Sequence, residues 1–366
     1  MPDTAQSVEA LDFQVLHEIV KAAKAKLDKG VWDYLMGGTE TETTQRRNRQ
    51  GIDALAFRPR VLRDVSKVDP STTLFGRKIR LPVLMAPIGS LESFEAGGGA
   101  SGAQGAGRFG VPLMLSSVCN PGLEAVAAAA PDAPRIFQLY VRGDPAFEDD
   151  HVKRATDNGY FAFAITVDTA HYSRRERDLA NRFVKPWRQR AVGMDHQAAY
   201  DWDRVKRFKD KNPQIPLILK GIGTGEDAAT AIAHGVEGIY VSNHGGRQLD
   251  HGRGSIEVRA EVAQVARGRA TIIVDGGFYR GTDVVKAIIL GADCVGMGRM
   301  LGLSLAAAGA DGLVRMLELL ETEIVTCLGL LGAPSLADLD ASHLCQSTPV
   351  APSTALSAFP LLAEGY

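Results

Sequence analysis

The sequence predicts an α/β fold, a (β/α)8 TIM barrel with an N-terminal helical extension and a long lid loop between the fourth strand and the fourth helix. Eight short apolar runs, rich in Val, Ile and Leu, recur from residue 81 onward, and a helix-like segment separates most of them. The runs are continuous rather than alternating, which indicates strands buried on both faces and therefore parallel. The chain has 366 residues, 45% of them hydrophobic, which is enough for one large barrel.

The eight runs predict the eight strands in order. They are Leu81–Met85, Val111–Leu115, Arg135–Tyr140, Phe161–Val167, Ile215–Leu219, Gly238–Val241, Thr271–Val274 and Asp293–Met297. Helices are expected between them, for example over Gly122–Ala130, Glu226–His234 and Thr282–Leu290. The alternative, an open doubly wound sheet, would carry a glycine-rich dinucleotide fingerprint after its first strand. Gly97-Gly98-Gly99 lacks that strand-to-helix context, so the closed barrel is favoured.

The ends of the chain and one internal stretch lie outside this rhythm. Residues 1–65 are expected to form N-terminal helices, because apolar residues recur with helical spacing over Asp12–Leu27. Residues 66–330 are expected to form the barrel, with one more amphipathic helix over Gly312–Cys327, and residues 1–366 to form a single domain. The arginine-rich residues 171–200 are expected to form the lid, and the tail, 347–366, to be flexible.

Composition and charge argue against several classes of partner. The net charge is −2, so no basic field predicts binding to nucleic acid or to an anionic membrane. No run of eighteen apolar residues predicts a membrane span, and no signal peptide is recognisable. The four cysteines lack a CxxC pair and are expected to be buried free thiols: Cys119, Cys294, Cys327 and Cys345. We therefore expect a cytoplasmic protein, and we predict no metal site.

Polar side chains follow seven of the eight runs, where the strands are expected to end. They are Ser116, Gln138, Tyr140, Thr166, Asp168, Lys220, the run Ser242 to Arg247, Asp275 and Arg299. The carboxyl ends of barrel strands meet on one face, so these residues predict an active site. Gly276-Gly277 and Gly298-Arg299 follow strands seven and eight, where barrels often bind phosphate. Glycine lets a backbone N–H approach closely and arginine adds a forked donor, so a phosphorylated ligand is predicted.

Two motifs carry a family resemblance. Ser-Asn-His-Gly-Gly-Arg-Gln-Leu-Asp (242–250) resembles the signature of the FMN-dependent α-hydroxy acid oxidases and dehydrogenases, as does Asp275-Gly276-Gly277 followed by Arg280-Gly281-Thr282-Asp283-Val284. This family includes glycolate oxidase, lactate oxidase, mandelate dehydrogenase and the flavin domain of flavocytochrome b2. The likeness runs from Val31 to His343. It implies FMN as the cofactor and oxidation of an (S)-2-hydroxy acid to the 2-oxo acid.

The resemblance also implies a role for each matching residue. His244 would be the catalytic base, backed by Asp168. Substrate would be contacted by Tyr34, Tyr140, Arg175, His244 and Arg247, of which Tyr140 and Arg247 also belong to the catalytic set. The cofactor would be bound by Pro87, Ile88 and Gly89 on the ring face, by Ser116, Gln138, Thr166, Lys220 and Ser242 around the polar edge of the ring, and by Asp275, Gly276, Gly277, Arg280, Gly298 and Arg299 at the ribityl-phosphate end.

The expected chemistry suits these residue types. Oxidation of the alcohol removes two protons, and an imidazole titrates near working pH, so it can accept one of them. A carboxylate orients the imidazole and stabilises the imidazolium. Two arginines hold a substrate carboxylate better than lysines, because each guanidinium can bind it bidentately. Outside this motif, His244 would be interpreted as a surface or capping histidine.

Three departures from the family pattern bear on ligand size and binding. Tyr279 stands before Arg280 where an arginine is usual, which removes or alters one phosphate contact. Val118 and Gly89 are small and widen the pocket, and the loop after Arg182 is shorter than in glycolate oxidase. These differences favour a bulky, aromatic substrate such as mandelate or 4-hydroxymandelate. O2 is the simplest electron acceptor, a quinone or carrier protein is an alternative, and a homotetramer is the default assembly.

Other functions fit the same scaffold. One is the FMN-dependent isopentenyl diphosphate isomerase, which the set of Tyr34, Tyr140, Arg175, Arg247 and His244 argues against. Another is a flavin oxidoreductase that acts on a peptide or amine intermediate of a biosynthesis. A non-catalytic binding module is disfavoured, because every acid–base and carboxylate-binding residue is in place.

Overall fold

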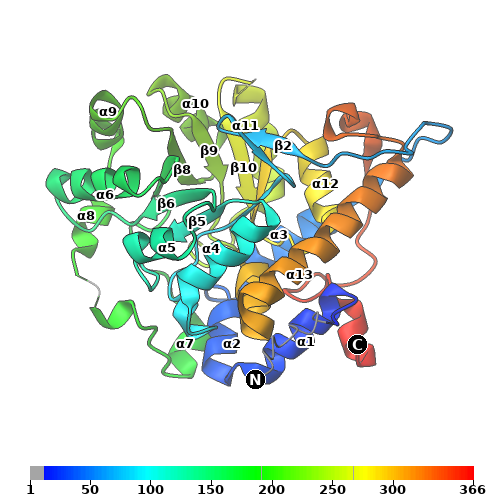
Figure 1. The fold of residues 1–366 in the computed structure, drawn as a ribbon, viewed down its shortest axis with the longest axis horizontal. Coiled ribbons are helices and arrows are strands. Elements are labelled where there is room, and N and C mark those ends of the chain that lie inside the picture. Colours follow the sequence, from blue (N-terminus) through cyan, green and yellow to red (C-terminus); the bar gives the residue numbers. More distant parts are fainter. Residues whose placement is uncertain (1–11, 191, 267) are drawn as a thin grey trace, which may run out of the picture.

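A closed barrel of eight parallel strands forms the centre of the protein (Figure 1). The computed structural model describes residues 12–190, 192–266 and 268–366. The strands, in their order around the barrel, are β4 (Val83–Met85), β5 (Leu113–Ser116), β6 (Arg135–Leu139), β7 (Ala162–Thr166), β8 (Leu217–Ile222), β9 (Gly238–Val241), β10 (Thr271–Asp275) and β11 (Cys294–Met297), which pairs with β4. Each predicted run overlaps one of these strands, so the predicted (β/α)8 barrel is confirmed.

Side chains fill the interior of the barrel and leave no pore. Leu84, Met114, Ile136, Ile218 and Tyr240 belong to one buried cluster inside it. A hairpin that the sequence did not predict, β2 (Thr72–Leu74) and β3 (Arg77–Ile79), adds Leu74 and Ile79 to the same cluster. The hairpin closes the barrel at the end where the strands begin. A ligand site must therefore lie at the opposite end, where the strands finish.

Helices cover the outside of the barrel. They are α4 (Gly98–Phe109), α5 (Leu123–Ala129), α6 (Pro145–Asp157), α9 (Trp202–Lys211), α10 (Gly225–Ala233), α11 (Ser255–Ala266), α12 (Gly281–Ile289) and α13 (Arg299–Leu331). Helix α13 contains the predicted Gly312–Cys327 helix and is interrupted by non-helical backbone at Ala308 and Gly309. It is long and apolar enough to span a membrane, but 67% of its most apolar window is buried inside the protein. It packs against α4 and α1 as a core helix.

The N-terminal extension lies beside the barrel. It comprises α1 (Leu16–Lys26), α2 (Lys29–Met36) and α3 (Thr43–Asp53). Strand β1 (Leu55–Phe57) pairs with β12 (Leu344–Gln346), which joins the segment after α3 to the segment before the tail. Cys345 lies on this two-stranded edge and is exposed, so the prediction of four buried thiols is wrong for this cysteine; the other three are buried.

The lid joins β7 to α9 and contains three short helices, α7 (Glu176–Ala180), η2 (Arg188–Arg190) and α8 (Met194–Ala198). Arg177 ties it to α2 and the following turn through Asp33 and Glu42. Lys185 and Asp178 form an ion pair, 2.7 Å apart, in which both side chains are buried. Burial, with Arg175 nearby, lowers the pKa of the Lys185 ammonium.

An aromatic residue anchors the C-terminal tail to the rest of the chain. Phe359 is buried and makes edge contacts with the rings of His17 and Tyr279. The remaining short helices are η1 (Leu91–Ser93), η3 (Leu336–Asp338), η4 (Ala341–His343) and η5 (Pro360–Glu364), and η5 lies beside α1 (Figure 1). Flexibility of the tail stays a prediction.

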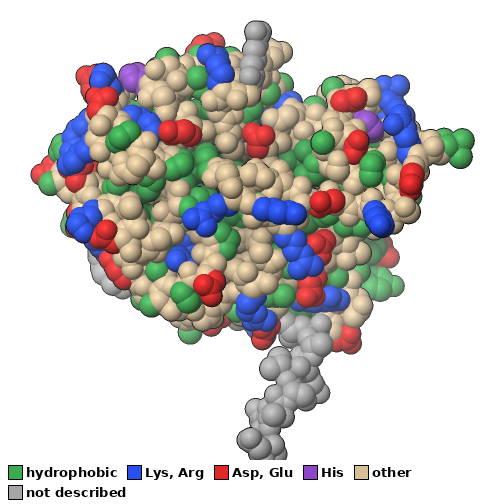
Figure 2. Space-filling view, turned by 45° about the horizontal axis from the view of Figure 1, so that its top comes forward, with side chains coloured by type: hydrophobic (Ala, Val, Ile, Leu, Met, Phe, Trp, Pro, Cys, Tyr) green, Lys and Arg blue, Asp and Glu red, His purple; other side chains and the backbone are tan. Residues whose placement is uncertain are grey.

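Charges of both signs are mixed over the face seen in Figure 2, and no large area of one sign stands out there. A field that would attract a polyanion needs such an area. The face seen in Figure 2 offers no such area.

Candidate active site

A cavity opens where the barrel strands end. Among its lining residues are fourteen of the predicted ones: Tyr34, Pro87, Ile88, Gly89, Tyr140, Arg175, Lys220, His244, Arg247, Asp275, Gly276, Gly277, Gly298 and Arg299. They come from six barrel strands or the loops after them, from α2 and from the lid. Ser116, Gln138, Thr166, Asp168, Ser242 and Arg280 do not line it. Val118 and Trp187 do, and only Val118 was singled out from the sequence.

His244 lies between a carboxylate and a phenol. Its Nδ1 is 3.1 Å from Oδ1 of Asp168, and its Nε2 is 3.3 Å from the hydroxyl of Tyr140. With the Nδ1 proton donated to the carboxylate, the Nε2 lone pair faces Tyr140 and the cavity. Burial lowers the pKa of His244 below its ordinary value, although Asp168 acts in the opposite direction. The imidazole is therefore neutral at pH 7 and able to accept a proton.

The backbone around His244 is left-handed over three residues. The φ angles are 60° at His244, 66° at Gly245 and 76° at Gly246. A Cβ at Gly246 would lie 2.5 Å from the backbone of Gln45 in α3. Only glycine permits this approach, which explains the two glycines after the histidine.

A pair of amides holds the same loop in place. Asn48 of α3 and Asn243 exchange two hydrogen bonds, of 2.9 and 2.7 Å. Asp250, at the end of the motif, accepts hydrogen bonds from the backbone of Thr41 and Thr44. These bonds outweigh burial and lower the pKa of Asp250. The N-terminal extension thus holds the loop that contains His244, a contact that the sequence did not reveal.

Two guanidinium groups beside His244 have no carboxylate partner among the residues that the structure describes. Arg175 is buried, and its Nε donates to the carbonyl of Arg247. Arg247 donates from Nη1 to the carbonyls of Tyr34 and Gly37, and its Nη2 and Nε have no acceptor in the described part of the chain. Burial, together with Arg175, lowers the pKa of Arg247 to about 10. Uncompensated buried cations favour an anionic ligand.

Lys220, Ser242 and Asp275 form a buried polar network at the ends of β8, β9 and β10. The ammonium of Lys220 donates to the hydroxyl of Ser242 over 2.9 Å and lies 3.2 Å from Asp275. The Ser242 hydroxyl donates to Asp275 over 2.6 Å and also accepts the His244 backbone N–H. The network connects the predicted cofactor residues to the base.

Gln138 and Thr166 provide a test of the fit to a flavin. Both are buried, and neither the Gln138 amide nor the Thr166 hydroxyl has a hydrogen-bond partner in the described residues. Thr166 pairs in register with Lys220, which lines the cavity. Buried polar groups cost free energy when they are left unpaired. The carbonyls and N–H of an isoalloxazine edge match these donors and acceptors, so the residues present fit the ring of FMN.

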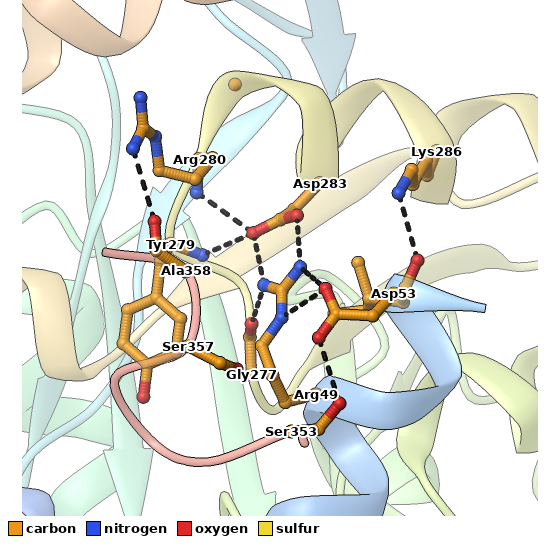
Figure 3. Close-up of polar contacts among 12 residues, drawn as sticks. Arg49, Asp53, Gly277, Tyr279, Arg280, Asp283, Lys286, Ser353, Ser357 and Ala358 are labelled. Carbon is orange, nitrogen blue, oxygen red and sulfur yellow. Dashed lines mark hydrogen bonds and ion pairs between the residues drawn. The ribbon is translucent and has the colours of Figure 1, made fainter. Parts of the chain in front are cut away.

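Of the two helix N-termini near the predicted phosphate loops, that of α13 is open to a phosphate and that of α12 is not. Gly298 and Arg299 line the cavity where α13 begins, and a helix N-terminus attracts phosphate. The N-terminus of α12 is satisfied within the protein: Tyr279 and Arg280 donate their N–H groups to Asp283. The Arg280 side chain pairs with Glu323. It also donates to the carbonyl of Ala358 (Figure 3). The structure does not bring Arg280 to the cavity.

Below this loop lies a buried brace that the sequence did not reveal (Figure 3). Arg49 of α3 binds both carboxylate oxygens of Asp283, at 2.6 and 2.8 Å, and donates to the carbonyl of Gly277. Its Nη2 also binds Asp53. The brace connects the N-terminal extension to the predicted phosphate loop. No motif within α3 signals it, because Gly277 and Asp283 lie more than 200 residues away from Arg49 in the chain.

The sequence matches one protein family over residues 23–346, and that family is described as FMN-dependent dehydrogenase. The chain belongs to this family. Glycolate oxidase 1 of Zea mays is 39% identical over 359 residues, which cover 92% of this chain and 96% of that protein. A peroxisomal (S)-2-hydroxyacid oxidase of Arabidopsis thaliana is 35% identical over 346 residues, which cover 89% and 95%.

Solved structures agree with this assignment. A mandelate oxidase variant with (S)-mandelic acid has a TM-score of 0.85 at 36% identity, covering 93% of this chain and 100% of that one. A variant of a mandelate oxidase is also known with a hydroxylated FMN adduct. FMN is the cofactor of the chain, which is an FMN-dependent 2-hydroxy acid oxidase or dehydrogenase. The family predicted from residues 242–250 and 275–284 is confirmed.

Proposed function

We propose that the chain oxidises an (S)-2-hydroxy acid with an aromatic substituent, such as mandelate or 4-hydroxymandelate, to the 2-oxo acid, and passes the electrons to O2 to give H2O2. The observation that supports a carboxylic acid as the substrate is the pair of guanidinium groups, Arg175 and Arg247, beside the imidazole of His244. A substrate carboxylate supplies the negative charge that they lack in the described residues. Free donors on Arg247 allow a bidentate contact.

Each residue around the substrate has one task in this proposal. Arg175 and Arg247 bind the carboxylate and fix the orientation of the alcohol carbon. Tyr140 donates a hydrogen bond to the substrate, and burial raises the pKa of its phenol, so it stays protonated. His244 accepts a proton at Nε2, and Asp168 stabilises the imidazolium. The bound FMN supplies the acceptor for the two electrons that the alcohol carbon loses.

The aromatic substituent is supported by the apolar part of the cavity. Ile88, Phe94, Val118 and Trp187 line it, and Gly89 contributes no side chain there. The mandelate oxidase structures, at 36% identity, make the same substrate class reasonable for this chain. Trp187 stands close to Gly89 and takes part of the space that the two small residues were expected to open.

Anaerobic mixing of the holoenzyme with single 2-hydroxy acids tests the proposal. Both enantiomers of mandelate, 4-hydroxymandelate and lactate, together with glycolate, should be compared by loss of visible flavin absorbance. We expect (S)-mandelate or (S)-4-hydroxymandelate to bleach fastest and to release H2O2 in air. Preference for glycolate would contradict the aromatic substrate. If no hydroxy acid bleaches the flavin, the oxidoreductase that acts on a peptide or amine is favoured. If the protein also converts isopentenyl diphosphate, the isomerase is favoured instead.

Assembly and location also belong to the proposal. A homotetramer is proposed, and light scattering on the holoenzyme tests it, since a monomer would exclude it. A cytoplasmic location is proposed, and fractionation of the source cells tests it. Neither feature enters the argument for the chemistry.

A further inference from the structure

Trp187 is a cavity residue whose position is set by the lid. It lies in the lid between α7 and α8, yet it lines the same cavity as His244 and Gly89. A Cβ built at Gly89 would lie 3.4 Å from both Cδ1 and Nε1 of its indole ring. The five-membered edge of the indole, with its N–H, therefore stands over the Gly89 backbone.

The indole N–H is a free donor at this edge. Nε1 of Trp187 donates no hydrogen bond to any residue that the structure describes. The nearby Tyr34 hydroxyl donates to the Gly89 carbonyl over 2.8 Å. The Gly89 carbonyl is thus already used by Tyr34. An indole offers a donor and no acceptor, so only an acceptor on a ligand, or water, can satisfy it.

Arg142 holds Trp187 from behind. Its guanidinium lies 4.8 Å from the Trp187 ring centroid and 6.0 Å from that of Tyr140. It has no carboxylate partner in the described residues, and burial lowers its pKa. Its Nε is buried and has no hydrogen-bond partner within residues 12–190, 192–266 and 268–366. Arg142 does not line the cavity, so its contacts support a role in fixing the angle between the two cavity rings.

We propose that Trp187 is the specificity-determining residue for the distal ring of the substrate, with Arg142 as its positioning residue. The inference rests on the proposed oxidation of an aromatic 2-hydroxy acid and deepens it. The ring of the substrate packs against the indole, and the free N–H selects a ring that carries a hydrogen-bond acceptor. The preferred class is then the ring-hydroxylated aryl 2-hydroxy acids, of which 4-hydroxymandelate is the test compound.

Two substitutions at Trp187 separate packing from hydrogen bonding. Trp187→Phe keeps a ring and removes the N–H, whereas Trp187→Leu removes both. With Trp187→Phe, kcat/KM for 4-hydroxymandelate should fall by about 2- to 10-fold, the usual range for one neutral hydrogen bond, and that for mandelate should stay within about 2-fold. With Trp187→Leu, both should fall by about 10-fold or more, and (S)-lactate, which has no ring, should be unaffected.

Matched variants check that the effect belongs to this site. Trp202→Phe changes a tryptophan that stacks on His234 outside the cavity, and should alter none of the three substrates. Arg142→Met should weaken the preference for aromatic over aliphatic substrate in the direction of Trp187→Leu. FMN content and thermal midpoint, measured for each variant, show whether it has folded with its cofactor.

The outcomes separate this inference from the proposed function. Equal losses for lactate and mandelate in Trp187→Leu, or an unchanged ratio of 4-hydroxymandelate to mandelate in Trp187→Phe, would overturn the role of Trp187. If the wild type oxidises no 2-hydroxy acid, the proposed function fails. The flavin spectral shift with 4-hydroxybenzoylformate against benzoylformate then still tests ring selection, and an equal dissociation constant for the two would overturn it.

Discussion

His244 shows how much of the chemistry depends on the surroundings of one side chain. Its ring nitrogens face Asp168 and Tyr140, and its backbone has a left-handed φ of 60°. Gly221, which precedes the end of β8, is also constrained, because a Cβ there would lie 2.7 Å from that of Asp168. The carboxylate can therefore approach the imidazole only if residue 221 is glycine.

The pH dependence of turnover follows from the balance at His244. Burial lowers its pKa, so kcat/KM of the holoenzyme should rise with pH through a value below 6.5 and be level around pH 7. In Asp168→Asn the imidazolium loses its stabilising carboxylate. The rise of kcat/KM with pH should therefore shift to lower pH, and its plateau value should fall by about 100-fold or more. A shift to higher pH would contradict this assignment; Asp157→Asn, on an exposed helix end, is the control.

Arg247 should be irreplaceable by lysine. Arg247→Lys keeps the charge but loses the bidentate donor geometry of the guanidinium. We therefore expect kcat/KM for the hydroxy acid to fall by about 10- to 100-fold, mainly through KM, and to fall further in Arg247→Met. Steady-state kinetics with the best substrate measure this. Arg182→Lys, on an exposed lid residue, should change nothing. Full activity in Arg247→Lys would show that a point charge is sufficient.

Among the elements, α3 has the largest influence on the site although it contributes no cavity residue. Asn48 reaches the loop of the base, and Arg49 reaches the loop after β10. Gly276 and Gly277 accommodate this contact, since a Cβ at either would lie about 3 Å from Asn48. The helix thus holds two active-site loops at once.

Breaking the brace should destabilise the protein and loosen FMN. Arg49→Met leaves the buried Asp283 carboxylate without its partner, which typically costs about 3–5 kcal/mol. Urea unfolding of the holoenzyme measures the loss, and FMN release on dilution measures the second effect. The double variant Arg49→Met with Asp283→Leu should lose less than the sum of the two single changes. Strict additivity would show that the two side chains are not coupled.

On the scale of the whole molecule, the two ends of the barrel have separate roles. The β2–β3 hairpin seals one end with apolar side chains, and the other end carries the polar cavity. We therefore expect a change at the sealed end to alter stability without altering the chemistry.

Leu74→Ala tests this separation. It should lower the free energy of unfolding by about 2–5 kcal/mol through the cavity left in the buried hairpin, without changing KM or the flavin spectrum. Leu62→Ala, on a fully exposed leucine, should change stability by no more than about 0.5 kcal/mol. An altered KM in Leu74→Ala would show that the two ends are linked.

Local sequence was sufficient to predict the barrel, its eight strands and most of the cavity. A strand buried on both faces is recognisable as a continuous apolar run, and the residue after it lies by topology at the mouth. The His244 motif is likewise local, because its base, its glycines and Arg247 lie within four residues of one another.

Tertiary packing alone decided the remaining features. Arg299 lines the cavity, whereas the guanidinium of Arg280 pairs with Glu323, although both arginines follow the end of a strand. Trp187 and Arg49 reach the site from segments with no local pattern that distinguishes them. The direction of a side chain depends on which partner, distant in the chain, lies nearest after folding, and that partner is set by packing rather than by the spacing of residues along the chain.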